Sequence, residues 1–253
     1  MPNYKIIVEY DGTDFVGWQQ QKNGNSIQSA LQEALFKLLG YDVLVFGAGR
    51  TDAGVHAKGQ IISFHINPKY SLHTIVNALN FRLPSDISVK SAQVVPKGFH
   101  PRRDATSRRY IYTILNSLTR SPMLENLSHH SPEQLNMDLM KESIIKFKGI
   151  HDFKLFSSKL EDPDGSTFRQ IYDATIHKTS DIIEIRIEGS SFLPRQVRRM
   201  AGAILDLGRS KLTSNQFDRL LEAKKTSAIA HALPPNGLCL QEVKYKNTPY
   251  WDN

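Results

Sequence analysis

Cysteine is almost absent from this 253-residue sequence, which contains only Cys239. A single thiol cannot form an internal disulfide, and it cannot build a cysteine-based zinc cluster. Proteins with few cysteines and no disulfide framework are typical of reducing, intracellular compartments. The scarcity of cysteine therefore predicts a cytoplasmic protein.

Long apolar runs are also missing. No run approaches the roughly 20 residues that a transmembrane helix needs. The chain enters an apolar strand pattern at once, from Tyr4 to Tyr10, which does not resemble a signal or transit peptide. We expect a soluble protein that does not associate with a membrane.

Acidic residues are in deficit. The sequence has 25 Asp and Glu against 32 Lys and Arg, which gives a formal net charge of +7 and a pI of about 9.4. A merely soluble basic protein would show the same balance, but the balance favours polyanionic partners. Arginine, which suits bidentate phosphate contacts and base stacking, is concentrated at Arg102-Arg103, Arg108-Arg109 and Arg195 with Arg198-Arg199. These clusters predict nucleic-acid binding.

A metal-binding pattern is absent too. The histidines show no HExxH spacing, and no group of thiolates supports them. We interpret them as surface, core or RNA-contacting residues: His56, His65, His100, His129, His130 and His151. The sequence therefore predicts no metal site.

The first part of the chain predicts one α+β half. Ser26 offers a helix N-cap, and apolar residues follow at helical spacing until Gly40, which fits a C-terminal stop. A second helix is expected over Leu72–Asn80, and strands are expected over Tyr4–Glu9, Val43–Phe46, Ile61–Ile66 and Ile87–Val95. Strand, helix, two strands, helix, strand is the split βαβ order of a ferredoxin-like unit.

The rest of the chain repeats this plan. Strands are expected over Arg109–Leu115, Ile171–His177, Ile182–Glu188 and Leu238–Tyr245, and helices over Met137–Phe147, from Pro194, and over Phe217–Leu221. The polar, basic stretch from Phe99 to Ala105 marks a boundary. We predict an α/β protein of the α+β type with two ferredoxin-like or RRM-like halves, residues 1–104 and 105–253, whose antiparallel sheets join around a central cleft.

The stretch from Gly47 to Ala57 is glycine-rich and joins two apolar segments. Its glycines indicate a tight turn. It contains one carboxylate, Asp52, with a cation two residues earlier, Arg50. A carboxylate beside cations and backbone N–H groups stays ionised at neutral pH, which suits a nucleophile or a general base. The alternative is an Asx-turn residue that bonds its own backbone, and the local pattern by itself favours that alternative.

Two phosphate-binding motifs do not fit this stretch. Asp52 stands where a third glycine would complete the dinucleotide fingerprint. The spacing from Gly49 to Gly54 is that of a P-loop, but Val55 and His56 replace the required lysine and hydroxyl residue.

The segment Gly49-Arg50-Thr51-Asp52-Ala53-Gly54-Val55-His56-Ala57 resembles the signature of the TruA family of tRNA pseudouridine synthases. The resemblance continues in order along nearly the whole chain, at Tyr10-Asp11-Gly12-Thr13, Gly17-Trp18-Gln19, Phe99-His100-Pro101-Arg102, Ala105 to Tyr112, Phe192-Leu193 through Val197-Arg198, and Pro235-Asn236-Gly237-Leu238. It implies a pseudouridine synthase fold and the isomerisation of uridine to pseudouridine in the anticodon stem-loop of tRNA, at positions 38, 39 and 40. It also implies a homodimer and a reaction without metal or organic cofactor.

The resemblance also implies roles for individual residues. Asp52 matches the catalytic nucleophile, Tyr110 the active-site tyrosine, and Arg198 the arginine that pairs with the aspartate. Arg50 matches a residue linked to extracting the target nucleotide. We further predict substrate or RNA contacts at Arg102, Arg108, Arg109, Arg195, Arg199 and Leu238, the arginines because their clusters suit phosphate binding.

Several alternatives stay open. Tyr110 is also compatible with a core strand tyrosine, and Tyr112 shares its face of the strand. The sequence does not decide whether Asp52 attacks C1′, attacks C6 or removes a sugar proton. Ser190-Ser191 and Pro194-Arg195 depart from the commoner bacterial pattern, which leaves the choice of uridine open and allows other tRNA or RNA uridines. The rival class is a non-catalytic RNA-binding protein with RRM-like sheets, but the RNP1 signature is missing.

Overall fold

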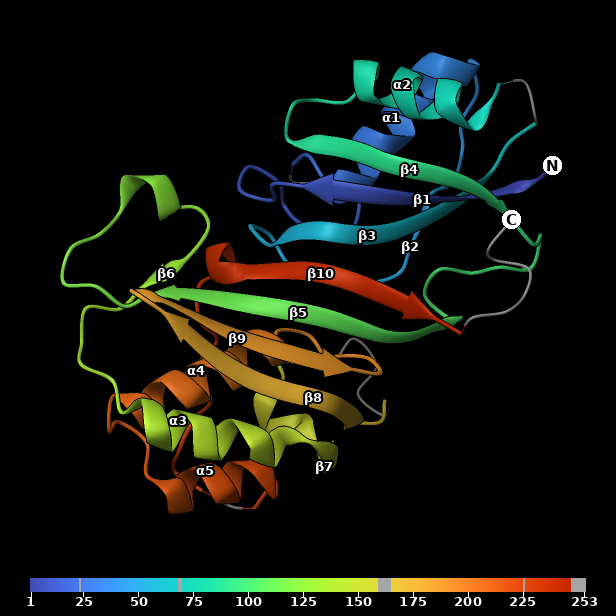
Figure 1. Cartoon of the computed structure of the whole chain (residues 1–253). Helices are drawn as coiled ribbons and strands as arrows, with labels where there is room; N and C mark the ends of the chain where they lie inside the picture. Colours follow the sequence, from blue (N-terminus) through green and yellow to red (C-terminus); the bar gives the residue numbers. More distant parts are fainter. Residues whose placement is uncertain (23, 68–69, 159–164, 225, 247–253) are drawn as a thin grey trace. The chain divides into compact units, whose positions relative to one another are not determined.

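The computed structural model describes residues 1–22, 24–67, 70–158, 165–224 and 226–246. The chain folds into two compact units (Figure 1). The first consists of Met1–Thr106 together with the chain from Leu240 onward, and the second consists of Ser107–Cys239. In each unit helices cover a largely antiparallel sheet, which confirms the predicted α+β class.

The first unit begins with the predicted split βαβ order. Its elements are β1 (Asn3–Tyr10), α1 (Ile27–Leu39), β2 (Phe46–Gly47), β3 (His56–His65), α2 (Leu72–Arg82), β4 (Ile87–Val95) and most of β10 (Leu238–Tyr245). The strands lie in the order β4-β1-β3-β10, and β2 pairs with β3. β1 runs antiparallel to both β3 and β4, and α1 and α2 lie on one face of this sheet (Figure 1).

The two ends of α1 follow the sequence prediction closely. The Ser26 side chain accepts a hydrogen bond from the Ser29 N–H, and the Ser29 side chain in turn accepts from the Ser26 N–H. Gly40 ends the helix with a φ of 81°, and its N–H donates to the Phe36 carbonyl oxygen. A left-handed residue at this position strongly favours glycine, so both caps are fixed by local sequence.

The strand predicted over Val43–Phe46 is wrong for its first three residues, because β2 covers only Phe46–Gly47. Val45 is buried, yet its backbone groups bond side chains of α1 instead of a neighbouring strand. Gln28 donates to the Val45 carbonyl oxygen at 3.0 Å, and the Val45 N–H donates to Gln32 at 3.5 Å. Val43 and Val45 thus pack in the core without joining a ladder, whereas Leu44 between them is exposed.

The second unit contains most of β5 (Ala105–Leu115), followed by β6 (His129–His130), α3 (Met137–Ile144), β7 (Gly149–Asp152), β8 (Phe168–Thr179), β9 (Ile182–Gly189), α4 (Gln196–Gly208) and α5 (Ser214–Leu221). Its strands lie in the order β5-β9-β8-β7, with antiparallel neighbours, and β6 pairs parallel with β5. Its described residues also include short 3₁₀ helices: η1 (Pro122–Leu124), η2 (Ile145–Phe147), η3 (Phe153–Phe156) and η4 (Pro235–Gly237). The short strands β6 and β7 have no clear signal in the sequence.

The helix expected to begin at Pro194 begins two residues later. Arg195 is the N-cap of α4 and has a left-handed backbone with φ of 60°, so Pro194 lies in the preceding turn. The Pro194 carbonyl oxygen accepts from the Ser158 N–H at 3.2 Å. The buried Gln196 side chain accepts from the Leu193 N–H at 2.8 Å and closes the turn. One tertiary contact, from Ser158, and one local contact, at Gln196, thus hold the turn that precedes the helix.

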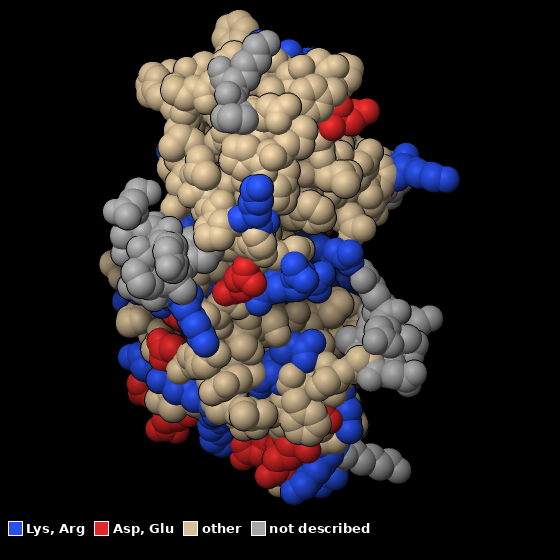
Figure 2. All heavy atoms as spheres, turned by 90° about the vertical axis from the view of Figure 1, so that its right-hand side faces the viewer, with Lys and Arg blue, Asp and Glu red and all other residues tan. Residues whose placement is uncertain are grey.

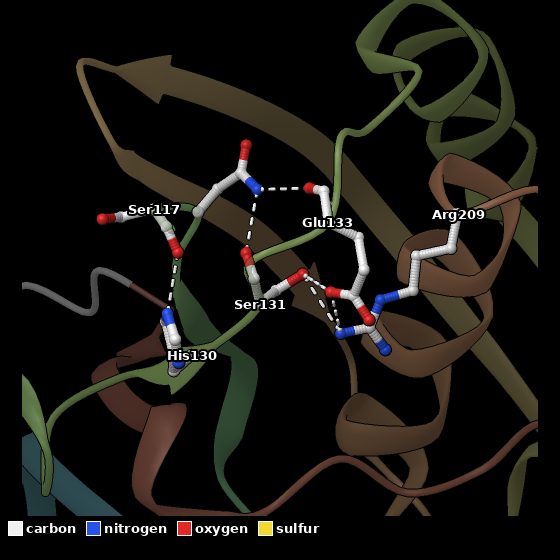
Figure 3. Close-up of polar contacts among 6 residues, drawn as sticks. Ser117, His130, Ser131, Glu133 and Arg209 are labelled. Carbon is white, nitrogen blue, oxygen red and sulfur yellow. Dashed lines mark hydrogen bonds and ion pairs between the residues drawn. The ribbon is translucent and has the colours of Figure 1, made fainter. Parts of the chain in front are cut away.

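A polar network ties the segment after β5 to the end of α4 (Figure 3). Arg209 donates to the Glu133 carboxylate at 3.0 Å and to the Ser131 hydroxyl at 3.1 Å, and that hydroxyl donates to Glu133 at 2.9 Å. Asn116 donates to the carbonyl oxygens of Ser131 and Glu133. The pKa of the Glu133 carboxyl lies below its usual range. Burial by itself would raise this pKa, but hydrogen bonds from the Glu133 backbone and from Ser131, together with the Arg209 charge, lower it.

Candidate active site

The glycine-rich loop that carries Asp52 connects β2 to β3 in the first unit. Gly54 has a φ of 75°, in the left-handed region that favours glycine. The Val55 N–H donates to the Asp52 carbonyl oxygen at 3.2 Å and closes a tight turn. Asp52 is half-buried and Arg50 is exposed. The loop therefore fixes its backbone while it leaves the carboxylate partly accessible.

An earlier turn of the same unit supports this loop. The Trp18 N–H donates to the Thr51 carbonyl oxygen at 3.0 Å, and the Gly54 N–H donates to the Phe15 carbonyl oxygen at 3.3 Å. Gly17 has a φ of 106°, and a Cβ there would lie 2.7 Å from the Thr51 carbonyl oxygen. This close backbone approach requires glycine at position 17.

Tyr110 lies in β5 of the second unit and is 8% exposed. Its ring meets the Phe192 ring edge to face, with the ring centroids 5.4 Å apart. Tyr112, two residues on, is fully buried, and its hydroxyl donates to the Pro234 carbonyl oxygen at 2.8 Å. Burial raises the pKa of Tyr112 above its usual range, although the nearby Arg198 charge works against this. The two tyrosines therefore have different neighbours.

Three arginines of the second unit meet at the start of α4. Arg198 is half-buried, and its Nε donates to the Leu233 carbonyl oxygen at 2.7 Å. Arg199 donates to the Ala230 carbonyl oxygen at 2.7 Å, whereas Arg195 is exposed. Burial lowers the pKa of the Arg199 guanidinium most, and the neighbouring charges of Arg195 and Arg198 lower it further. Like charges at a positive helix N-terminus repel one another, so this position favours an anion.

Arg108 and Arg109 both have partners within the second unit. Arg108 is buried, and it donates to the Ser190 carbonyl oxygen at 2.7 Å. Arg109 pairs with the Glu188 carboxylate at 3.1 Å, and the Ser107 hydroxyl donates to the other oxygen of that carboxylate at 2.7 Å. These contacts fix both guanidinium groups against the β5–β9 pair.

The last two predicted residues lie at element ends. Arg102 is exposed in the turn before β5, and its N–H donates to the His100 ring at 3.2 Å. Leu238 is buried at the first position of β10, directly after η4. In the first unit the structure thus places Arg50 and Asp52 in one loop and Arg102 in the turn before β5.

The second unit brings together residues that the sequence did not connect. Arg198 and Tyr112 bond the neighbouring carbonyl oxygens of Leu233 and Pro234, so both anchor the segment that leads to Leu238. Gly237 packs against the Tyr112 ring, where a Cβ would lie 2.7 Å from a ring carbon. In the sequence, this anchored segment is signalled only by the prolines and the glycine that precede Leu238.

Neither a metal centre nor a membrane span emerges from the residues that the structure describes. Within the described ranges, no group of three or more His, Cys, Asp or Glu side chains is arranged to hold a metal ion. The same residues include no helix with the length and apolar character needed to span a bilayer.

Figure 2 shows one face of the molecule, on which lysine and arginine atoms gather in several groups separated by uncharged surface. Acidic atoms lie beside some of these groups. On this face, lysine and arginine are therefore distributed over several groups rather than collected in one block (Figure 2).

Comparison with known proteins identifies the class. A family model described as tRNA pseudouridine synthase matches residues 6–103 and 144–246. These residues include the Asp52 loop, the arginine cluster of α4 and the whole of β10. The chain is thus an enzyme of the isomerase class. It belongs to the tRNA pseudouridine synthase family, as the resemblance of its signature predicted.

Curated relatives match along almost their whole length. tRNA pseudouridine synthase A of Geotalea daltonii is 41% identical over 245 residues, which is 97% of this chain and 100% of the relative. The protein of the same name from Thermoanaerobacter sp. is 39% identical over 245 residues with the same coverage. A solved archaeal box H/ACA sRNP Nop10–Cbf5 complex has a TM-score of 0.36 at 9% identity, over 80% of this chain and 43% of that one, too low to support an argument.

Proposed function

We propose that this enzyme isomerises uridine to pseudouridine in the anticodon stem-loop of tRNA, at positions 38, 39 and 40. The observation that carries the proposal is Asp52, a partly accessible carboxylate in a loop whose backbone is fixed by a tight turn and by Trp18. The full-length relatives are named for action on tRNA, which supports tRNA as the substrate.

In this proposal Asp52 is the nucleophile. The N1–C1′ bond breaks, the base turns, and C5 bonds to C1′. The bond that Asp52 forms breaks again, C5 loses its proton, and N1 gains one. Product and substrate are isomers, so the reaction requires no oxidant or reductant. One positioned carboxylate suits this chemistry, and no metal or organic cofactor takes part.

Tyr110 and Arg198 complete the proposed site. The Tyr110 ring stacks on the extracted base, and its hydroxyl transfers a proton. Arg198 pairs with the Asp52 carboxylate and fixes its orientation through a planar guanidinium. The hydrogen bond from Arg198 Nε to the Leu233 carbonyl oxygen supports this role, because it restrains the orientation of the guanidinium group.

The RNA is held by arginines in this proposal. Arg102 and Arg195 are exposed and grip phosphates, whereas Arg50 acts at the flipped uridine. Arg108, Arg109, Arg199 and Leu238 remain predicted RNA or substrate contacts. The division into residues 1–104 and 105–253, a homodimer that holds one tRNA, and a cytoplasmic location also remain predictions.

The test uses unmodified tRNA transcripts incubated with the purified protein. Carbodiimide labelling and primer extension map each pseudouridine, and tritium release from [5-³H]uridine tRNA measures turnover. The wild-type protein should modify the anticodon stem-loop, and Asp52→Asn should abolish turnover while tRNA binding remains. Asp14→Asn makes the same change at an exposed carboxylate and should leave turnover unchanged.

The alternatives predict different results. Pseudouridine at other positions would keep the reaction and replace the substrate assignment. Binding of tRNA without any tritium release from the wild type would favour a non-catalytic RNA-binding protein. Near-normal turnover by Asp52→Asn would remove Asp52 from the chemistry.

A further inference from the structure

One polar side chain interrupts the apolar interior of β3. Gln60, Ile62 and Phe64 occupy alternate positions, and all three are fully buried. Alternate residues of a strand face the same side of a sheet, so Gln60 lies where the pattern calls for an apolar side chain. A buried amide is costly unless hydrogen bonds compensate it, so its partners are informative.

Those partners belong to the Asp52 loop and to β1. The Gln60 amide donates to the Gly49 carbonyl oxygen at 3.0 Å and lies 3.5 Å from the Tyr10 hydroxyl. The Tyr10 hydroxyl in turn lies 2.8 Å from the Thr51 hydroxyl, in a buried hydrogen bond. A connected set of bonds therefore runs from two sheet strands to the residues on either side of Arg50.

Tyr10 reaches the loop because of its position in the sheet. It is the last residue of β1, on the buried face that also carries Tyr4, Ile6 and Val8. The register between β1 and β3 shifts there, since Val8 pairs with Gln60 while Tyr10 pairs with Ala57. The β3 partners advance by three residues where β1 advances by two, a bulge of the kind that redirects side chains near functional sites.

Thr51 is thereby held at two points. Its hydroxyl bonds Tyr10, and its carbonyl oxygen accepts from the Trp18 N–H. Thr51 is 7% exposed, and the next residue is Asp52. Fixing both the side chain and the carbonyl of one residue restricts where the backbone places the following side chain.

We propose that Tyr10, supported by Gln60, is a positioning residue that orients Asp52 through Thr51. The inference rests on the proposed function, because it needs Asp52 to act in the reaction. A misplacement of about 1 Å can slow an enzyme roughly 10²-fold. Loss of one anchor from a loop that keeps its backbone contacts should therefore slow chemistry by about 10-fold without abolishing it.

The first experiment is Tyr10→Phe, which removes the hydroxyl and keeps the buried ring. We measure the single-turnover rate at saturating tRNA, the Kd for tRNA, and the melting temperature. The single-turnover rate should fall about 10-fold while the Kd stays within about twofold, because the change acts on Asp52 and not on RNA contacts. Tyr4→Phe is the matched control on the same buried face of β1 and should leave the rate unchanged.

The second experiment tests the bond itself. Thr51→Val removes the partner hydroxyl at nearly constant shape and should slow the single-turnover rate as Tyr10→Phe does, whereas Thr51→Ser keeps a hydroxyl and should restore most of it. If the two hydroxyls act through one bond, the double variant Tyr10→Phe with Thr51→Val should be no slower than the slower single variant, within about twofold.

Three outcomes would overturn the inference. They are a wild-type single-turnover rate in Tyr10→Phe, equal losses in Tyr4→Phe and Tyr10→Phe, and fully multiplicative losses in the double variant. A folded wild type that forms no pseudouridine would instead refute the proposed function. An active wild type with an inactive Asp52→Asn and an unaffected Tyr10→Phe would refute only the positioning role.

Discussion

Two tyrosines on one face of β5 should respond differently to the loss of a hydroxyl. Tyr112→Phe removes the donor to the Pro234 carbonyl from a fully buried side chain. Tyr110→Phe removes a hydroxyl that we propose acts in proton transfer, and it keeps the edge-to-face contact with Phe192. We expect the first change to affect stability and the second to affect chemistry.

The magnitude for Tyr112→Phe follows from the bond that is lost. A neutral hydrogen bond contributes about 0.5–1.5 kcal/mol. Pro234 is exposed, so its carbonyl oxygen can accept from water once the tyrosine hydroxyl is gone. We therefore expect the free energy of unfolding to fall by about 1 kcal/mol. At about 2–4 °C per kcal/mol for a domain of 150–250 residues, the melting temperature should fall by about 2–4 °C.

The catalytic consequence is larger for Tyr110→Phe. General acid–base catalysis contributes about 10²–10⁴-fold, so the single-turnover rate should fall by about 10²-fold or more while tRNA affinity holds. The assays are urea unfolding, thermal melting and single-turnover tritium release on both variants. A Tyr110→Phe variant with wild-type chemistry would reduce Tyr110 to a stacking or core residue. A Tyr112→Phe variant of unchanged stability would refute the argument from the Pro234 bond.

Three further predictions concern charged groups. Arg198→Ala should remove most activity and Arg198→Lys should restore only part of it, because a point charge does not reproduce a planar fork; single-turnover rates decide this. Arg102→Ala should weaken binding of every tRNA alike and reduce the slope of log K against log salt by roughly 0.9, whereas Arg50→Ala should keep the slope and lower the single-turnover rate. An unaltered slope in Arg102→Ala and a flatter one in Arg50→Ala would reverse these roles. Glu133→Gln should lower the free energy of unfolding by under about 1 kcal/mol at pH 7. Folding lowers the pKa of Glu133, so the stability that its carboxylate contributes is present above the ordinary pKa of glutamate and is lost as the pH falls. In urea unfolding, the difference between wild type and variant should therefore shrink at acidic pH.

Local sequence determined much of the fold. The caps of α1 at Ser26 and Gly40 are properties of a few neighbouring residues, and the buried face of β1 follows from simple alternation. These features depend on backbone conformations and periodicities that act over one or two turns. The prediction failed where contacts from elsewhere in the chain were involved, as at Val45, which bonds side chains of α1, and at Pro194, whose carbonyl oxygen accepts from the Ser158 N–H.

For the candidate site, the sequence alone identified the Asp52 loop, its glycines and the family to which the chain belongs. Only the tertiary structure decided what surrounds those residues. Tyr10 lies far from Thr51 and Asp52 along the chain, and it reaches the loop where the register between β1 and β3 shifts, while Gln60 bonds back to Gly49 from within β3. Likewise, the bonds from Tyr112 and Arg198 to the Leu233–Pro234 segment span 122 and 35 residues. Such contacts depend on strand register and helix packing, which no local pattern of residues specifies.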